Sequence, residues 1–228
     1  MKNARKAGFS LFEVLIAVAI VAILSVAVGI PVAKNLNQGK ISRAQSDAQV
    51  IGNSILDFYK DVGQWPAQTD LDASPEAFRL VGNYELGRGN EGIARGTDQA
   101  LGSNTWASYG TTTTLTEQLI RNRSGNTYPL YKESEKPHTD PSWNGPYLDK
   151  IPLDPWGRPF VVNIGFALPS ISGSVTSENE YHNVMVVSAG KNGLFETTFD
   201  SRAYNEKVDG DDIGFVILGA RKFKHNEE

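Results

Sequence analysis

The sequence predicts an α+β fold: a long N-terminal helix, half transmembrane and half amphipathic, packed on a C-terminal antiparallel sheet. Three observations predict it. An almost uninterrupted apolar run occupies residues 9–30, an apolar stripe at helical spacing follows over residues 44–62, and short β-branched runs gather in the last third of the chain. A helix first and strands later, without alternation of the two, favours an antiparallel sheet.

The apolar run has the length of a membrane anchor. From Phe9 to Ile30 there are 22 residues, and the polar side chains among them are Ser10, Glu13 and Ser25. As a helix the run spans roughly 33 Å, close to the hydrocarbon thickness of a bilayer. Three cations precede it, and none of the first eight residues is acidic. The positive-inside rule therefore places the N-terminus in the cytoplasm and the rest of the chain outside.

Two ordinary interpretations of this run stay open. A secretory signal would be cleaved after it, and residues 25–27 form a passable small-x-small site. A plain single-pass anchor would not be cleaved. Neither interpretation explains Gly8 or Glu13. An acid at the bilayer centre costs about 2.5–3.5 kcal/mol, so Glu13 needs either an interfacial place or a partner.

The second half of the helix is amphipathic. Pro31 closes the apolar run, and we expect it to kink the helix without ending it. The residues of the stripe recur at intervals of three and four, which predicts one buried helix face; they are Ala44, Ala48, Ile51, Ile55, Phe58 and Val62. Gly63 is a stop signal. This face is expected to pack on a globular domain.

The middle of the chain is less regular. Ser74, Pro75 and Glu76 predict the start of a short helix that continues to about Val81. Residues 82–110 are rich in Gly, Asn, Ser and Thr, which indicates a loop. Few periodic apolar residues lie there, so we expect the domain to fold without residues 87–110. A second short helix is predicted over residues 115–123.

The last third of the chain predicts strands. Short runs of β-branched and aromatic residues, separated by turn residues, occur at 160–164, 183–188 and 215–218. Such runs are typical of a small antiparallel sheet.

Composition and motifs narrow the class of function. The 228 residues include no cysteine and carry a net charge of -4 with dispersed cations, which gives little support to nucleic-acid binding. His138, His182 and His225 lack metal-ligand spacing, and Ser188 is not in a nucleophile elbow. We find no phosphate-binding loop or other catalytic constellation, so the sequence does not predict an enzyme.

The string GFSLFEVLIAV, residues 8–18, resembles the prepilin signal of the type IV pilin superfamily. In that family a short basic leader ends in Gly, Phe follows, and a Glu lies four residues further on; here these are Gly8, Phe9 and Glu13. The resemblance implies cytoplasmic cleavage after Gly8 by a prepilin peptidase and N-methylation of Phe9. It also implies that Glu13 pairs with the Phe9 amine of a neighbouring subunit, which would satisfy a buried acid on assembly.

A second string, WNGPYLDKIPLDPWGRPF at residues 143–160, resembles the major pseudopilin of type II secretion systems. The stretch at residues 56–66 resembles the same family. Pro and Gly in residues 154–157 predict a turn, and we interpret these residues as scaffold. Residues 82–128 are not covered by the resemblance and are interpreted as an insertion. The implied division is a cleaved leader at 1–8, a transmembrane and assembly helix at 9–30, and a periplasmic globular domain at 31–228.

The implied function is a structural subunit of a periplasmic pseudopilus that drives export of folded proteins. Its implied partners are further copies of itself, minor pseudopilins, the inner-membrane assembly platform, the prepilin peptidase and, before assembly, inner-membrane lipid. Two alternatives stay open. One is a type IV pilin or minor pilin of a surface filament, and the other is a membrane-anchored periplasmic binding domain or enzyme.

The resemblance also implies calcium. In major pseudopilins, loops comparable to residues 188–193 and 209–213 hold the ion. The implied ligands are the carbonyl of Ala189 and the side chains of Asn192, Asp209 and Asp212. Asn192 stands where the family usually has Asp, and residues 194–208 form a longer connection than expected. Calcium takes 6–8 oxygen ligands, carbonyls among them. The alternative is a solvated acidic turn.

Overall fold

The computed structural model describes residues 8–68, 79–82, 95–96, 106, 112–123, 130–133, 141–167, 183–199 and 208–219. The chain divides into two compact units, residues 1–42 and 43–228. Residues 1–7 of the predicted leader and residues 74–78 of the predicted short helix lie outside the described part.

The helix α1, Leu11–Val62, begins in the first unit and ends in the second. It continues through Pro31, as the sequence predicts. In the first unit, the large apolar side chains that the structure describes are exposed, except for the half-buried Ile41. Among the described residues, no helix is both long enough and apolar enough to cross a membrane.

The second unit is built on a five-stranded sheet with the strand order β3-β1-β4-β5-β7. Its strands are β1 (Arg79–Val81), β3 (Thr112–Thr114), β4 (Val161–Val162), β5 (Val184–Ser188) and β7 (Ile213–Leu218). A separate parallel pair consists of β2 (Arg95–Gly96) and β6 (Leu194–Phe195). A short π-helix, η1 (Glu117–Arg121), follows β3, and a 3-10 helix, η2 (Ile164–Ala167), follows β4.

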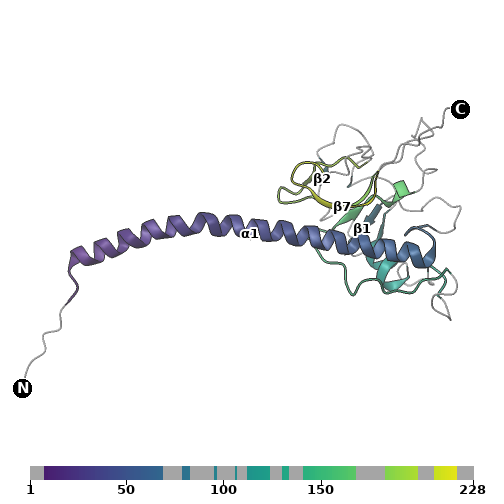
Figure 1. Cartoon of the computed structure of the whole chain (residues 1–228), viewed down its shortest axis with the longest axis horizontal. Coiled ribbons are helices and arrows are strands. Elements are labelled where there is room, and N and C mark those ends of the chain that lie inside the picture. Colours follow the sequence, from purple (N-terminus) through teal and green to yellow (C-terminus); the bar gives the residue numbers. More distant parts are fainter. Residues whose placement is uncertain are drawn as a thin grey trace, which may run out of the picture. The chain divides into compact units, whose positions relative to one another are not determined.

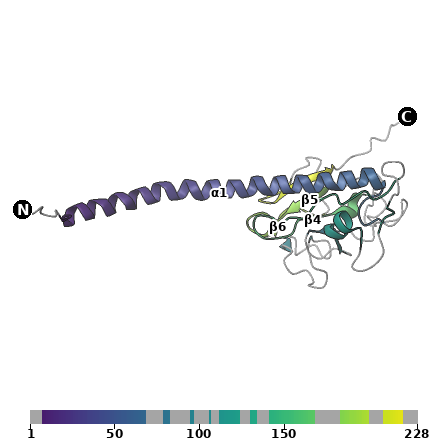
Figure 2. The same cartoon turned by 90° about the horizontal axis from the view of Figure 1, so that it is seen from below.

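The apolar stripe of α1 is the helical side of the core. Five of its six residues have no exposed surface, and Val62 is also buried, which confirms the predicted face. Figure 1 shows this end of α1 beside β1 and β7, and Figure 2 shows it over β4 and β5. Gly63 ends the helix with a φ of +74°, and its N–H donates to the carbonyl of Tyr59 at 2.8 Å. Glycine tolerates this left-handed cap without strain.

The Gly-Pro-Tyr-Leu segment covers the C-terminal end of α1. The ring of Tyr147 meets Phe58 edge-on at a centroid distance of 5.5 Å, and Tyr131 does so at 4.8 Å. The N–H of Tyr147 donates to the carbonyl of Leu119, which ties this segment to η1. These contacts support the interpretation of the segment as scaffold.

Most predicted elements are confirmed, and two predictions are wrong. β4, β5, β7 and η1 fall within or overlap the predicted runs. Residues 79–81, however, form strand β1 and not the end of a helix, because pairing with β3 and β4 buries all three. The sheet is also mixed: β1 and β3 are parallel, whereas the other three pairings are antiparallel. A parallel pair needs a long connection, and 30 residues separate β1 from β3.

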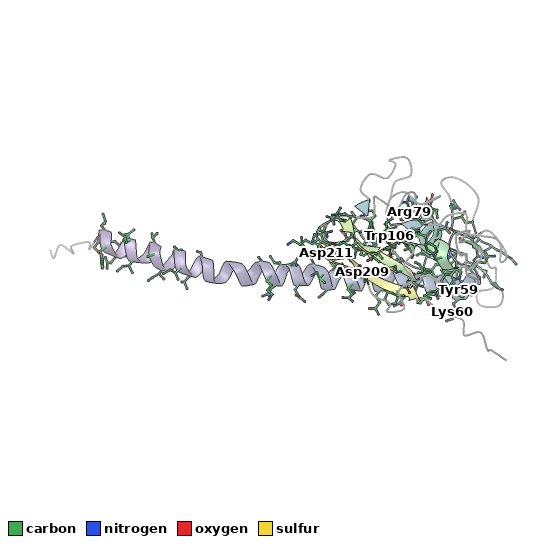
Figure 3. All side chains as sticks on the ribbon, turned by 90° about the horizontal axis from the view of Figure 1, so that it is seen from above. Tyr59, Lys60, Arg79, Trp106, Asp209 and Asp211 are labelled. Carbon is green, nitrogen blue, oxygen red and sulfur yellow. The ribbon has the colours of Figure 1, made fainter. Side chains whose placement is uncertain are left out.

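One residue of the Gly-rich stretch lies in the core, which argues against the expectation that the domain folds without residues 87–110. Trp106 is 1% exposed, stacks on Phe195 at 5.2 Å and meets Phe199 edge-on at 4.9 Å. Its indole N–H donates to the carbonyl of Thr197 at 2.6 Å. The guanidinium of Arg79 donates to the Trp106 carbonyl, and the two residues lie side by side in Figure 3. The segment therefore contributes a central side chain; that it is an insertion stays a prediction.

Candidate functional site

The N-terminal residues Ser10 and Glu13 form a capping box at the start of α1. The Ser10 N–H donates to Glu13 Oε2 at 2.8 Å, and the Glu13 N–H donates to Ser10 Oγ at 3.2 Å. The Ser10 hydroxyl also donates to Glu13 Oε2 at 3.0 Å. This reciprocal arrangement satisfies donors that a helix start leaves open. Phe9 beside it is 88% exposed, so the predicted cleavage junction is accessible.

Two loops meet at one end of the sheet. The first loop, residues 189–193, follows β5, and the second loop, residues 208–212, precedes β7. They are neighbours because β5 and β7 are antiparallel, with Ser188 opposite Ile213. Gly190, at a φ of +57°, makes the approach possible: an ideal Cβ there would lie 2.0 Å from the carbonyl oxygen of Asp211. No other residue type fits such a contact in the left-handed region.

Three carboxylates gather where the two loops meet. They belong to Glu196, which follows β6, and to Asp211 and Asp212 of the second loop. One oxygen from each lies within 4.8 Å of the others. We call these residues the carboxylate cluster. Their backbones and side chains are interlocked, since the N–H of Asp211 donates to Glu196 Oε2 and the N–H of Glu196 donates to Asp212 Oδ2. Figure 3 shows Asp211 close to Asp209 at this end of the domain.

Asp212 is the distinctive member of the cluster. It is 8% exposed, and its Oδ2 accepts the N–H groups of Glu196 and Thr197 at 2.8 and 2.7 Å. Its Oδ1 is buried and has no hydrogen-bond partner among the described residues. Burial raises the pKa of the Asp212 carboxyl to about 6, although the two N–H donors act against that rise. A buried, unpaired carboxylate oxygen costs free energy unless a proton or a cation satisfies it.

Asp211 is joined to the first loop by two hydrogen bonds. Its Oδ2 accepts the N–H groups of Lys191 and Asn192 at 3.0 and 2.9 Å. The amide of Asn192 donates to Glu196 Oε1 at 3.1 Å, and its Oδ1 accepts the N–H of Leu194 at 2.7 Å. The position of the carboxylate cluster is therefore coupled to the backbone of the first loop.

The structure brings together part of the predicted ligand set. Asp212 is in the carboxylate cluster, whereas Asp209 is not one of its three members. The side chain of Asn192 contacts the cluster through Glu196. The carbonyl of Ala189 accepts the N–H of Gly193 at 3.1 Å, which closes the first loop. Whether these four residues bind an ion stays a prediction.

Two members of the cluster were missed from the sequence. Asp211 is adjacent to Asp212 in an acidic run, so the run itself was the available signal. Glu196 has no such signal, because it lies 15 residues before Asp211 and reaches the cluster only through folding. As a set, the residues fit a hard cation: three carboxylates converge, and one buried oxygen among them has no partner in the described part of the chain. Such oxygen ligands are those that calcium prefers.

Comparison with known proteins found two matching family models. One, described as the prokaryotic N-terminal methylation motif, matches residues 3–29. The other, described as type II secretion system protein G, matches residues 126–197. No curated protein and no solved structure matched the chain.

Proposed function

We propose, from the premise that this chain is a type IV pilin-like pseudopilin of a type II secretion system, that it polymerises through α1 into a periplasmic filament. Pseudopilins are structural subunits and not enzymes. The observation that supports the proposal best is the pairing of a methylation motif at residues 3–29 with a protein G match at residues 126–197 in one chain.

The proposed sequence of events begins in the inner membrane. The apolar run anchors the precursor with its N-terminus in the cytoplasm and the globular domain in the periplasm. Prepilin peptidase cleaves after Gly8, and Phe9 becomes the methylated N-terminus. Processed subunits then assemble with minor pseudopilins on the inner-membrane platform, and growth of the filament drives export of folded proteins. The exposed apolar side chains of the first unit are the surface that neighbouring subunits would cover.

Mass spectrometry of the native protein tests the processing step. We expect a mature chain that begins at methylated Phe9. A mature N-terminus at Val28 would instead indicate a secretory signal, and an intact Met1 would indicate a plain anchor. Either result would contradict the pseudopilin assembly that we propose.

Glu13 is proposed to pair with the Phe9 amine of an incoming subunit. Glu13→Gln keeps the size of the side chain but removes its charge. Glutamine can still complete a capping box. We expect normal levels in the membrane fraction and a loss of filament formation or of reporter secretion. Ser10→Ala is the matched control, because it removes the hydroxyl of the capping box and leaves the charge. Equal loss in both variants would assign the defect to the helix start instead of to the ion pair.

We further propose that the two loops bind calcium. Asp212, Asp211 and Glu196 would supply carboxylate oxygens, and the resemblance adds Asp209, Asn192 and the carbonyl of Ala189. An ion between the loops would neutralise the clustered charge and join β5 to β7 in a chain without disulfides. Binding to the folded state alone contributes RT ln(1 + [L]/Kd), about 2.7 kcal/mol at a hundredfold excess over Kd.

Asp212→Asn gives the sharpest test of this site. In chelator, the variant removes a buried charge, one oxygen of which has no partner among the residues that the structure describes, so its melting temperature should equal or exceed that of the parent chain. In saturating calcium, the parent chain should gain several degrees and Asp212→Asn should gain little. Asp209→Asn tests the ligand implied by the resemblance, and exposed Asp149→Asn is the control. Equal melting temperatures of the parent chain in calcium and in chelator would rule the site out.

A further inference from the structure

The turn at residues 154–158 is joined directly to the first loop. Asp154 is 3% exposed, and its Oδ1 accepts the N–H groups of Trp156 and Arg158 at 2.9 and 2.8 Å. Gly157 closes the turn at a φ of +85°, and its N–H donates to the Asp154 carbonyl. One oxygen of the Asp154 carboxylate thus organises the turn, which leaves the other free to act elsewhere.

That second oxygen reaches the end of β5. The hydroxyl of Ser188 donates to Asp154 Oδ2 at 2.7 Å, and Ser188 Oγ in turn accepts the N–H of Gly190 at 3.3 Å. A charged acceptor orients the hydroxyl strongly. The N–H side of the Gly190 peptide is therefore held by the turn through one hydroxyl.

Arg158 holds the other side of the same loop. Its Nη1 donates to the carbonyl of Gly190 at 2.6 Å. Its guanidinium also lies against Gly193, where an ideal Cβ would be 2.6 Å from Nη2. Arg158 therefore contacts the first loop near both ends, and that loop presents the N–H groups that orient Asp211.

We propose that Arg158 and Ser188 are positioning residues for the calcium site, through which the turn at 154–158 fixes the first loop and, by it, the Asp211 carboxylate. This inference rests on the proposed calcium site. It assigns a binding role to a turn that the sequence predicts only as scaffold. Partners of this kind, one shell outside the ligands, typically change metal affinity by about 10- to 100-fold when they are removed.

A purely electrostatic role for Arg158 predicts the opposite sign. A cation near the site repels calcium, so its removal would strengthen binding if charge were the main effect. Loss of positioning weakens binding. Arg158→Lys keeps the charge and loses the planar fork that reaches Gly190 and Gly193, whereas Ser188→Ala breaks the link to Asp154 without any change of charge.

The experiment is a calcium titration of the purified full-length chain in detergent by isothermal calorimetry, with thermal unfolding in chelator as the second readout. We expect Arg158→Lys and Ser188→Ala each to raise the calcium Kd about tenfold, with cooperative unfolding retained in chelator. Arg121→Lys, at an exposed position on η1, should leave the Kd unchanged.

Four results would overturn the inference, and they are distinguishable. Unchanged Kd values in both variants, or tighter binding in Arg158→Ala, would show that the turn does not position the loop. Loss of cooperative unfolding in chelator for both variants would show a general structural role. Absence of calcium binding by the parent chain would remove the calcium site itself.

Discussion

Trp106→Ala tests the finding that a Gly-rich stretch of the chain contributes a central side chain of the core. The indole is 1% exposed and lies between two aromatic rings, at 5.2 and 4.9 Å. Replacing a buried Trp by Ala typically costs about 3–5 kcal/mol, because apolar burial is lost and a cavity remains. The Thr197 carbonyl also loses its indole donor, which adds about 1 kcal/mol.

The expected total of about 4–6 kcal/mol is a large part of the 5–15 kcal/mol by which domains are usually stable. Urea unfolding of the full-length chain in detergent and chelator, followed by circular dichroism, measures it. Trp106→Phe keeps a ring but not the N–H and should cost less than Trp106→Ala. Leu153→Ala is the control, because Leu153 is 40% exposed, and such surface changes usually stay within about 0.5 kcal/mol.

A cost below about 1 kcal/mol for Trp106→Ala would refute the reasoning. It would mean that the stretch covers the domain without supporting it, as the composition of residues 82–110 alone suggests. The same result would revive the expectation that the domain folds without residues 87–110.

Three further predictions concern the second unit. Gly52→Ala should lower stability by about 1–3 kcal/mol in urea unfolding, because its Cβ would lie 2.3 Å from the ring of Phe215. Gly190→Ala should weaken calcium binding and lower the melting temperature more than Gly157→Ala; both have positive φ, but a Cβ at Gly157 meets no atom within 4 Å. In chelator, the raised pKa of Asp212, about 6, means that its contribution to stability is present below about pH 4 and lost as pH rises through 6. The melting temperature of Asp212→Asn should not show that loss.

The sequence was sufficient for elements whose patterns are local. The α1 stripe is buried as its spacing predicts, and Gly63, the predicted stop signal, ends the helix in a left-handed cap. β5 and β7 are short apolar runs between turn residues, so their type could also be read directly. In each case a local pattern and the tertiary environment favour the same structure.

The sequence was insufficient to predict elements whose structure depends on pairing between distant residues. Arg79 is polar and follows a helix-start signal, yet it is 2% exposed in a strand paired on both sides. Trp106 lies in a stretch rich in Gly, Ser and Thr without a periodic apolar pattern, and periodicity cannot assign such a residue to a core. Glu196 joins the carboxylate cluster because the loops at the end of β5 and β7 close around it, and no spacing rule reports that.

The capping box changes the energetic argument about Glu13. From sequence, Glu13 is an acid without a partner until a second subunit supplies one. In the structure its Oε2 already accepts the N–H and the hydroxyl of Ser10. In the proposed assembly, an ion pair with the Phe9 amine would either replace these hydrogen bonds or form in addition to them. Breaking a buried ion pair typically costs about 3–5 kcal/mol. Because Glu13 keeps Ser10 as a local partner, we expect the cost of losing its ion pair to be at or below that range. Because Oε2 accepts both donors of Ser10, Oε1 would be the oxygen that pairs with the amine in the proposed assembly.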